Sequence, residues 1–227
     1  MKPYVNPYTD IAFKRLFGQE STKDILMDFL NALLPIETPI TSLTLTNTEV
    51  LRDFKLQRGI LFDIRCTDEH GATFIVEMQR LREEYFFDRS VFYASSAIRA
   101  QLEKGDSDFR LKPVFFLAIM DFLLDEPELR RGAIQEISLR NKEGFEAYKK
   151  LRFLFVQMPL FTKNLDELAT RRDEWLYALR ELPKLEQMPA PLKQEPIFRK
   201  FFDIAAEANM TPAEYAVYEK ELNERRI

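Results

Sequence analysis

Two runs of alternating hydrophobic and polar residues, 60–66 and 73–79, are the clearest pattern along the chain. A period of two is typical of strands that bury one face. The link between them, 67–72, is polar and contains Gly71, as a hairpin loop does. The sequence therefore predicts a β-hairpin, with Phe62, Ile64 and Cys66 on one face of the first strand and Phe74, Val76 and Met78 on one face of the second.

The register of this hairpin places two carboxylates opposite each other. With the loop centred near His70, Asp63 faces Glu77 across the two strands. Like charges directly opposed in a sheet are destabilising, so a fold normally avoids this arrangement. A divalent cation bound between the two carboxylates would remove the repulsion. The same register pairs Phe62 with Met78 and Ile64 with Val76.

The rest of the chain shows helical periodicity and further apolar runs. The run 114–120 is almost continuously apolar, which predicts a buried central strand. Residues 211–214 (TPAE) resemble a capping box with proline at the first helical position. The pattern predicts helices over 9–18, 21–34, 82–104, 173–182, 196–208 and 211–226, with strands over 42–51, 133–140 and 152–158.

This order of elements predicts an α/β fold, in which a mixed sheet is flanked by helices and followed by a smaller helical region. We expect a first domain over residues 1–165 and the helical region over 166–227. The segment 183–196 contains four prolines and is the best candidate for a linker.

The amino-acid composition argues against several classes of protein. The 227 residues are 46% hydrophobic and include 20 phenylalanines, which is enough apolar surface for a sizeable core. The net charge of −4 argues against a broadly basic nucleic-acid-binding surface. One cysteine and one histidine exclude an internal disulfide and make a zinc site improbable. Without an apolar signal-peptide core or a membrane-length apolar run, we expect a soluble cytoplasmic protein.

An ordered set of segments resembles a known family. The arrangement of Asp63, Glu77 and Gln79 on consecutive strands between two helices is similar to the PD-(D/E)XK nuclease fold. The surrounding segments resemble the recombination-promoting nucleases and transposases of that superfamily. They are 10–18 (DIAFKRLFG), 29–33 (FLNAL), 61–63 (LFD), 76–79 (VEMQ), 88–93 (DRSVFY) and 111–115 (LKPVF), and more weakly 158–161 and the helix around Trp175.

The resemblance implies a restriction-endonuclease-like sheet and metal-dependent cleavage of DNA, in recombination, mobile elements or defence. Asp63 and Glu77 would then hold Mg²⁺ or Mn²⁺, which prefer hard oxygen ligands. Gln79 occupies the position at which the wider fold has a lysine. An amide orients water and donates a hydrogen bond but carries no positive charge. A lysine or arginine from elsewhere, such as Lys14, would compensate.

Simpler roles compete for the candidate site residues. Asp63 and Glu77 can face solvent and pair with Arg65 or Arg80. Asp10 is either a third carboxylate or an early-turn acid that favours the helix dipole. Glu49 can share the sheet face of Asp63. Arg89 and Tyr93 can contact phosphate; alternatively, Arg89 pairs with an acid and Tyr93 packs on the sheet. We expect His70 to be solvated and Cys66 to lie in the core.

Two other functions remain open on the sequence alone. A non-catalytic module with a degenerate site would bind nucleic acid or a protein partner, and an enzyme of the same chemistry would act on RNA. For a DNA enzyme, the acidic balance predicts local contacts to the DNA backbone, and a homodimer cutting two strands is compatible with weak binding by one copy. The candidate contacts are Lys14, Arg80, Arg82 and Arg89.

Overall fold

The computed structural model describes residues 3–46, 63–82, 84–102 and 108–224. Contacts between Cα atoms divide the chain into two compact units. One unit is Thr41–Leu160, and the other joins Met1–Ile40 to Phe161–Ile227. The first 40 residues therefore group with the C-terminal helices, whereas the sequence-based division at 165/166 places them with the sheet. That division into domains remains a prediction.

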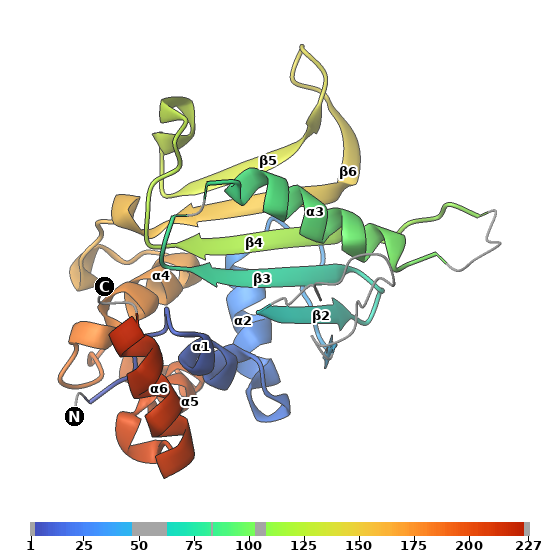
Figure 1. Ribbon diagram of the computed structural model, residues 1–227. Coiled ribbons are helices and arrows are strands. Elements are labelled where there is room, and N and C mark those ends of the chain that lie inside the picture. The colour runs from blue at the N-terminus through green and yellow to red at the C-terminus, as the bar shows by residue number, and fades with distance from the viewer. Residues whose placement is uncertain (1–2, 47–62, 83, 103–107, 225–227) are drawn as a thin grey trace. The chain divides into compact units, whose positions relative to one another are not determined.

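The unit Thr41–Leu160 is built on one mixed sheet (Figure 1). Its strands lie in the order β1-β2-β3-β4-β6-β5. The pairs β1–β2, β2–β3 and β5–β6 are antiparallel, and β3–β4 and β4–β6 are parallel. The bounds are β1 Leu43–Leu45, β2 Ile64–Asp68, β3 Thr73–Gln79, β4 Val114–Met120, β5 Ile134–Arg140 and β6 Glu146–Gln157, and the helix of this unit is α3, Phe86–Arg99.

The hairpin β2–β3 has the predicted register. Ile64 lies opposite Val76 in an antiparallel pair, as expected, whereas Phe62 lies outside the described residues. The loop is closed by Asp68, whose Oδ1 accepts hydrogen bonds from the backbone N–H of His70 (2.9 Å) and of Ala72 (2.8 Å). Gly71 adopts φ = 85°, a conformation that favours glycine.

One face of the sheet forms a core with α3. Every residue of β4 is buried, as predicted for a central strand. In Figure 1, α3 lies across the face of the sheet formed by β3, β4 and β6. The residues of this core are Ile75, Phe86, Ala94, Ala97, Val114, Phe116, Ala118, Met120, Leu124 and Phe155.

The second unit is helical. Its helices are α1 (Asp10–Phe17), α2 (Lys23–Leu33), α4 (Arg171–Glu181), α5 (Pro196–Ala205) and α6 (Pro212–Glu224). Thr9 caps α1 as predicted, because its Oγ1 accepts from the backbone N–H of Ala12 at 3.3 Å. The predicted capping box of α6 is also present, with Thr211 N–H donating to Glu214 Oε2 at 2.8 Å and Glu214 N–H donating to Thr211 Oγ1 at 3.2 Å.

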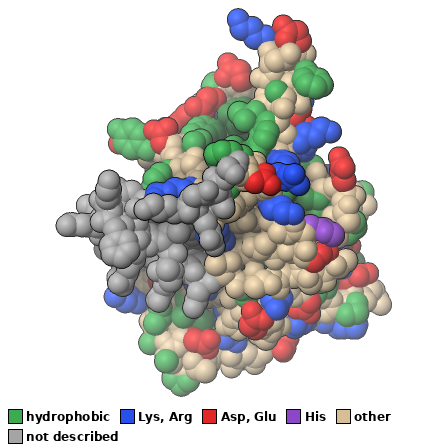
Figure 2. Space-filling view, turned by 90° about the vertical axis from the view of Figure 1, so that its right-hand side faces the viewer, with side chains coloured by type: hydrophobic (Ala, Val, Ile, Leu, Met, Phe, Trp, Pro, Cys, Tyr) green, Lys and Arg blue, Asp and Glu red, His purple; other side chains and the backbone are tan. Residues whose placement is uncertain are grey.

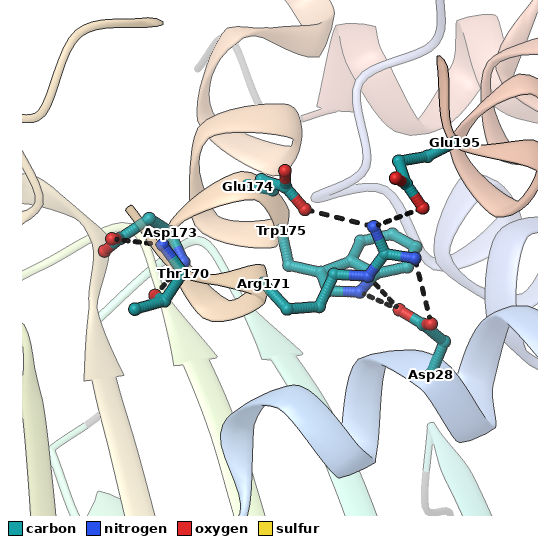
Figure 3. A network of polar contacts seen from close by, with 7 residues as sticks. All are labelled: Asp28, Thr170, Arg171, Asp173, Glu174, Trp175 and Glu195. Carbon is teal, nitrogen blue, oxygen red and sulfur yellow. Dashed lines mark hydrogen bonds and ion pairs between the residues drawn. The ribbon is translucent and has the colours of Figure 1, made fainter. Parts of the chain in front are cut away.

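A polar network ties α2 to α4 (Figure 3). The carboxylate of Asp28 accepts from Trp175 Nε1 at 2.6 Å and from Arg171 Nε at 3.0 Å. Arg171 also pairs with Glu174 at 3.0 Å and with Glu195, just before α5, at 3.2 Å. Because Trp175 is fully buried, its indole N–H needs this acceptor. Asp28 therefore has a structural role as the acceptor of this buried N–H.

Several predicted boundaries differ from the structure. The helix expected over 82–104 begins at Phe86 and ends at Arg99, and no side-chain hydrogen bond from Tyr85 caps its start. The last strand begins at Glu146 rather than 152, because its polar first half pairs with β5 beyond a bulge at Ser138/Leu139. Of the strand expected over 42–51, only 43–45 is strand among the described residues. The segment 183–196 connects α4 to α5 within one unit and buries Leu192.

Candidate active site

Asp63 and Glu77 meet at the end of the hairpin. Since Ile64 pairs with Val76, the next opposed position brings Asp63 to Glu77. The backbone N–H of Asp63 donates to Glu77 Oε1 at 3.2 Å. The backbone N–H of Met78 donates to Asp63 Oδ2 at 2.8 Å. Each carboxylate therefore accepts a hydrogen bond from the backbone of the facing segment, and the predicted juxtaposition of the two residues is confirmed.

The chemistry of this pair fits a hard divalent cation. Glu77 is only 2% exposed, whereas Asp63 is half-buried, so the pair lies at the edge of the covered region. The ionised carboxylate is the form that binds a metal. A carboxylate has more lone pairs than one hydrogen bond uses. With two carboxylate ligands from the protein, the remaining coordination positions of Mg²⁺ would be filled by water and substrate oxygens.

Among the described residues, no further His, Cys, Asp or Glu joins this pair to form a larger metal-binding group. Within the described ranges, no group of three or more His, Cys, Asp or Glu side chains is arranged to hold a metal ion. Glu49 lies outside those ranges. Asp10, the other proposed carboxylate, is the first residue of α1 in the helical unit, where it pairs with Lys14 at 2.9 Å. The metal assignment therefore depends on Asp63 and Glu77.

Gln79 lies two residues after Glu77 and points to the same face of the sheet, because side chains alternate along a strand. This is the face covered by α3, since Ile75, of the same parity, belongs to the core with that helix. The backbone of Gln79 is fixed at the strand end, where its carbonyl accepts from the N–H of Asp121 at 2.9 Å.

Arg89, in the first turns of α3, contacts the side chain of Gln79. With the amide oriented so that its oxygen faces the guanidinium, this oxygen accepts hydrogen bonds from Arg89 Nη2 and, at 3.3 Å, from Nη1. The Cζ atom of Arg89 lies 5.7 Å from the ring centroids of both Phe86 and Tyr93. The sequence named Arg89 and Tyr93 as a pair on one helix face but did not predict the contact with Gln79.

Tyr93 packs toward the sheet, which is the simpler of the two roles that the sequence left open. Its ring centroid lies 6.5 Å from that of Phe116 on β4. Arg65 is a second arginine on the α3 face, because it lies opposite Ile75, which belongs to the core with that helix. Burial lowers the pKa of its guanidinium from the ordinary value, although arginine remains protonated at neutral pH. Sequence reasoning considered Arg65 only as an ion-pair partner.

The remaining candidates lie in other surroundings. Arg82 forms an ion pair with Asp125. The side chain of His70 is 67% exposed in the hairpin loop, as expected. Cys66 is fully buried, as predicted, and burial raises the pKa of its thiol to about 12. No described helix has the length and apolar character needed to cross a membrane.

Comparison with known families identifies the chain. The sequence model described as PD-(D/E)XK nuclease family transposase matches residues 7–226, so this protein belongs to that family. Neither the curated proteins nor the solved structures yield a match. The mixed sheet, six-stranded in the part of the chain that the structure describes, and its helix α3 are consistent with the restriction-endonuclease-like α/β fold that the sequence predicted. Membership supports a nuclease-type function.

Proposed function

From this membership and from the paired carboxylates, we propose that the protein is a divalent-metal-dependent endonuclease that hydrolyses DNA phosphodiester bonds. Its setting would be recombination, mobile elements or defence. The observation that carries the proposal is the pair of backbone hydrogen bonds that lock Asp63 and Glu77 against each other. A fold that places two carboxylates opposite each other at the end of a hairpin accepts a destabilising contact, and a bound cation would offset it.

Each side chain has a role that follows from its chemistry. Asp63 and Glu77 would hold Mg²⁺ or Mn²⁺, which supplies a Lewis acid and lowers the pKa of a bound water. Gln79 would orient the attacking water through its amide. In the reaction, the water oxygen bonds to phosphorus as the bond to the leaving oxygen breaks. The proton lost by the water passes to solvent, and the leaving oxygen takes a proton from solvent.

The proposal is tested by removing charge from the metal site without removing its hydrogen bonds. Asp63→Asn keeps an oxygen that accepts from Met78 N–H but loses the negative charge. We expect Asp63→Asn to cleave supercoiled plasmid in Mg²⁺ or Mn²⁺ no faster than the wild type does in EDTA. Asp63→Ala should show the same loss. Far-UV circular dichroism should remain that of the wild type, and calorimetric titration with Mn²⁺ should show weakened binding.

A matched control is Asp108→Asn, which removes one carboxylate charge from an exposed position of the same unit. It should cut at the wild-type rate. Wild-type cleavage by purified Asp63→Asn would contradict the catalytic assignment.

The alternative of a non-catalytic module draws on one observation, namely that position 79 carries a neutral side chain. The same assays separate the two functions. A module would bind DNA or a protein partner without metal-dependent nicking, and Asp63→Asn would leave that binding unchanged. Parallel digestion of RNA of the same sequence would show whether the substrate class extends beyond DNA.

A further inference from the structure

The proposed site lacks a positive charge in its motif residues. Asp63 and Glu77 are acidic, and Gln79 is neutral. A phosphodiester is itself an anion, and negative charge builds on its oxygens as the water attacks. An electrostatic site with no cationic side chain would leave part of this charge without stabilisation.

Arg89 is in contact with one of these residues. With the amide of Gln79 oriented so that its oxygen faces the guanidinium, Arg89 donates to that oxygen through Nη2 and Nη1. Because the oxygen end of the amide is engaged, the NH₂ end is the one presented for hydrogen bonding elsewhere. The contact therefore fixes which end of Gln79 serves as donor, a choice that an unsupported amide leaves open.

The position of Arg89 is set by the fold rather than by a mobile loop. Its guanidinium carbon lies 5.7 Å from the rings of Phe86 and Tyr93. Phe86 is buried in the core between α3 and the sheet, and Tyr93 lies against Phe116. A guanidinium near two aromatic rings loses little freedom on forming its hydrogen bonds. This arrangement is the preorganisation that a site needs before charge develops.

We propose that Arg89 is a positioning residue that acts through Gln79, so that the two side chains work as one cationic unit. Arg89 holds the amide so that its NH₂ group is the donor toward the attacking water, and its charge polarises that amide. This inference rests on the proposed nuclease function. It assigns the missing positive charge to α3 rather than to Lys14, which pairs with Asp10 in the helical unit.

A double-mutant cycle measures whether the two residues act together. Rates of plasmid nicking are measured under saturating DNA for wild type, Gln79→Ala, Arg89→Ala and the double variant. Each single change should lower kcat roughly 10²-fold, as for the loss of one transition-state donor, with a smaller change in KM. The double variant should lose no more than about the same factor. Multiplied losses would mean that Arg89 acts independently, and would overturn the proposal.

A second pair of variants separates this role from simple support of the helix. Gln79→Lys places a positive charge at position 79 itself. In that background Arg89→Ala should change kcat little. A purely structural Arg89 would lower the activity of Gln79→Lys as much as that of the wild type, which would also overturn the proposal. Arg99→Ala, an exposed change in the last turn of the same helix, should leave kcat unchanged.

The contact can also be followed without any catalysis. In protein labelled with ¹⁵N-glutamine, the side-chain amide signal of Gln79 is assigned by its loss in Gln79→Ala. It should shift in Arg89→Ala and stay in place in Arg99→Ala; an unmoved signal in Arg89→Ala would rule the contact out. If the wild type shows no cleavage with Mg²⁺ or Mn²⁺, the proposed function fails and this inference with it. Full cleavage by Arg89→Ala overturns the inference alone.

Discussion

At the scale of single residues, Glu69 joins the hairpin loop to the start of β1. Its carboxylate accepts from Thr41 Oγ1 at 2.5 Å and from the backbone N–H groups of Thr41 and Ser42, each at 3.1 Å. The hydrogen bond from the Thr41 hydroxyl is the largest cause that lowers the pKa of Glu69 to about 2, with backbone N–H donors adding to it. The ionised form is thus favoured by folding.

The lowered pKa of Glu69 makes the stability of the protein depend on pH in a definite direction. A carboxyl whose pKa is depressed by folding contributes stability above its unfolded pKa and loses it as the pH falls through the folded value. We therefore expect Glu69→Gln to lower the free energy of unfolding at neutral pH. The difference from wild type should shrink as the pH falls from about 4.5 to about 2. Urea titrations across this range measure it, with the exposed Glu143→Gln as control. A constant difference at all pH values would contradict the assignment.

The part of the site that could be predicted from the sequence is the pair of opposed carboxylates, because the alternation of apolar and polar residues determines how the two segments of the hairpin face each other. A period of two and one hairpin loop were enough to oppose Asp63 and Glu77, because a strand register has few solutions. The contact of Arg89 with Gln79 was not predictable. It depends on how α3 lies across the sheet, and helical periodicity says which face is buried but not which strand end it reaches.

At the scale of elements, the β2–β3 hairpin depends on its turn glycine. Gly71 has φ = 85°, and a Cβ there would lie 3.3 Å from Lys112 Cγ. An L-residue in this conformation costs about 1 kcal/mol, so Gly71→Ala should lower the free energy of unfolding by about that amount. Gly132→Ala is the matched control, since a Cβ there meets nothing within 4 Å and its φ is not positive. Urea unfolding followed by circular dichroism compares the two; equal stabilities would contradict the strain.

Element boundaries followed the sequence where hydrophobicity changes sharply. The apolar run of β4 matches its predicted limits of 114 and 120 because the strand is buried throughout. The polar half of β6 was missed, since its residues pair with β5 in an exposed extension that leaves little hydrophobic signal. The end of the helix expected at 104 was also wrong. Periodicity continues past Arg99, but the described helix stops there.

At the scale of the whole molecule, charge limits how the protein can hold DNA. The net charge is −4, and on the face drawn in Figure 2 the Lys and Arg side chains are interspersed with Asp and Glu. Some candidate contacts also have partners within the chain, since Arg82 pairs with Asp125 and Lys14 with Asp10. DNA binding should therefore depend on a few phosphate contacts near the proposed site.

This expectation can be read from the salt dependence of binding. Each neutralised phosphate contributes about −0.9 to the slope of log affinity against log salt. We expect a shallow slope for the Asp63→Asn protein, in which cleavage does not interfere. Adding Arg80→Ala should make the slope less steep by about 0.9, because Arg80 directly follows β3 at the end of the strand that carries Glu77. Arg89→Ala should change the slope less, since its guanidinium is engaged with Gln79. Arg131→Ala, an exposed change before β5, is the control, and an affinity independent of salt would remove the phosphate contacts from the proposal.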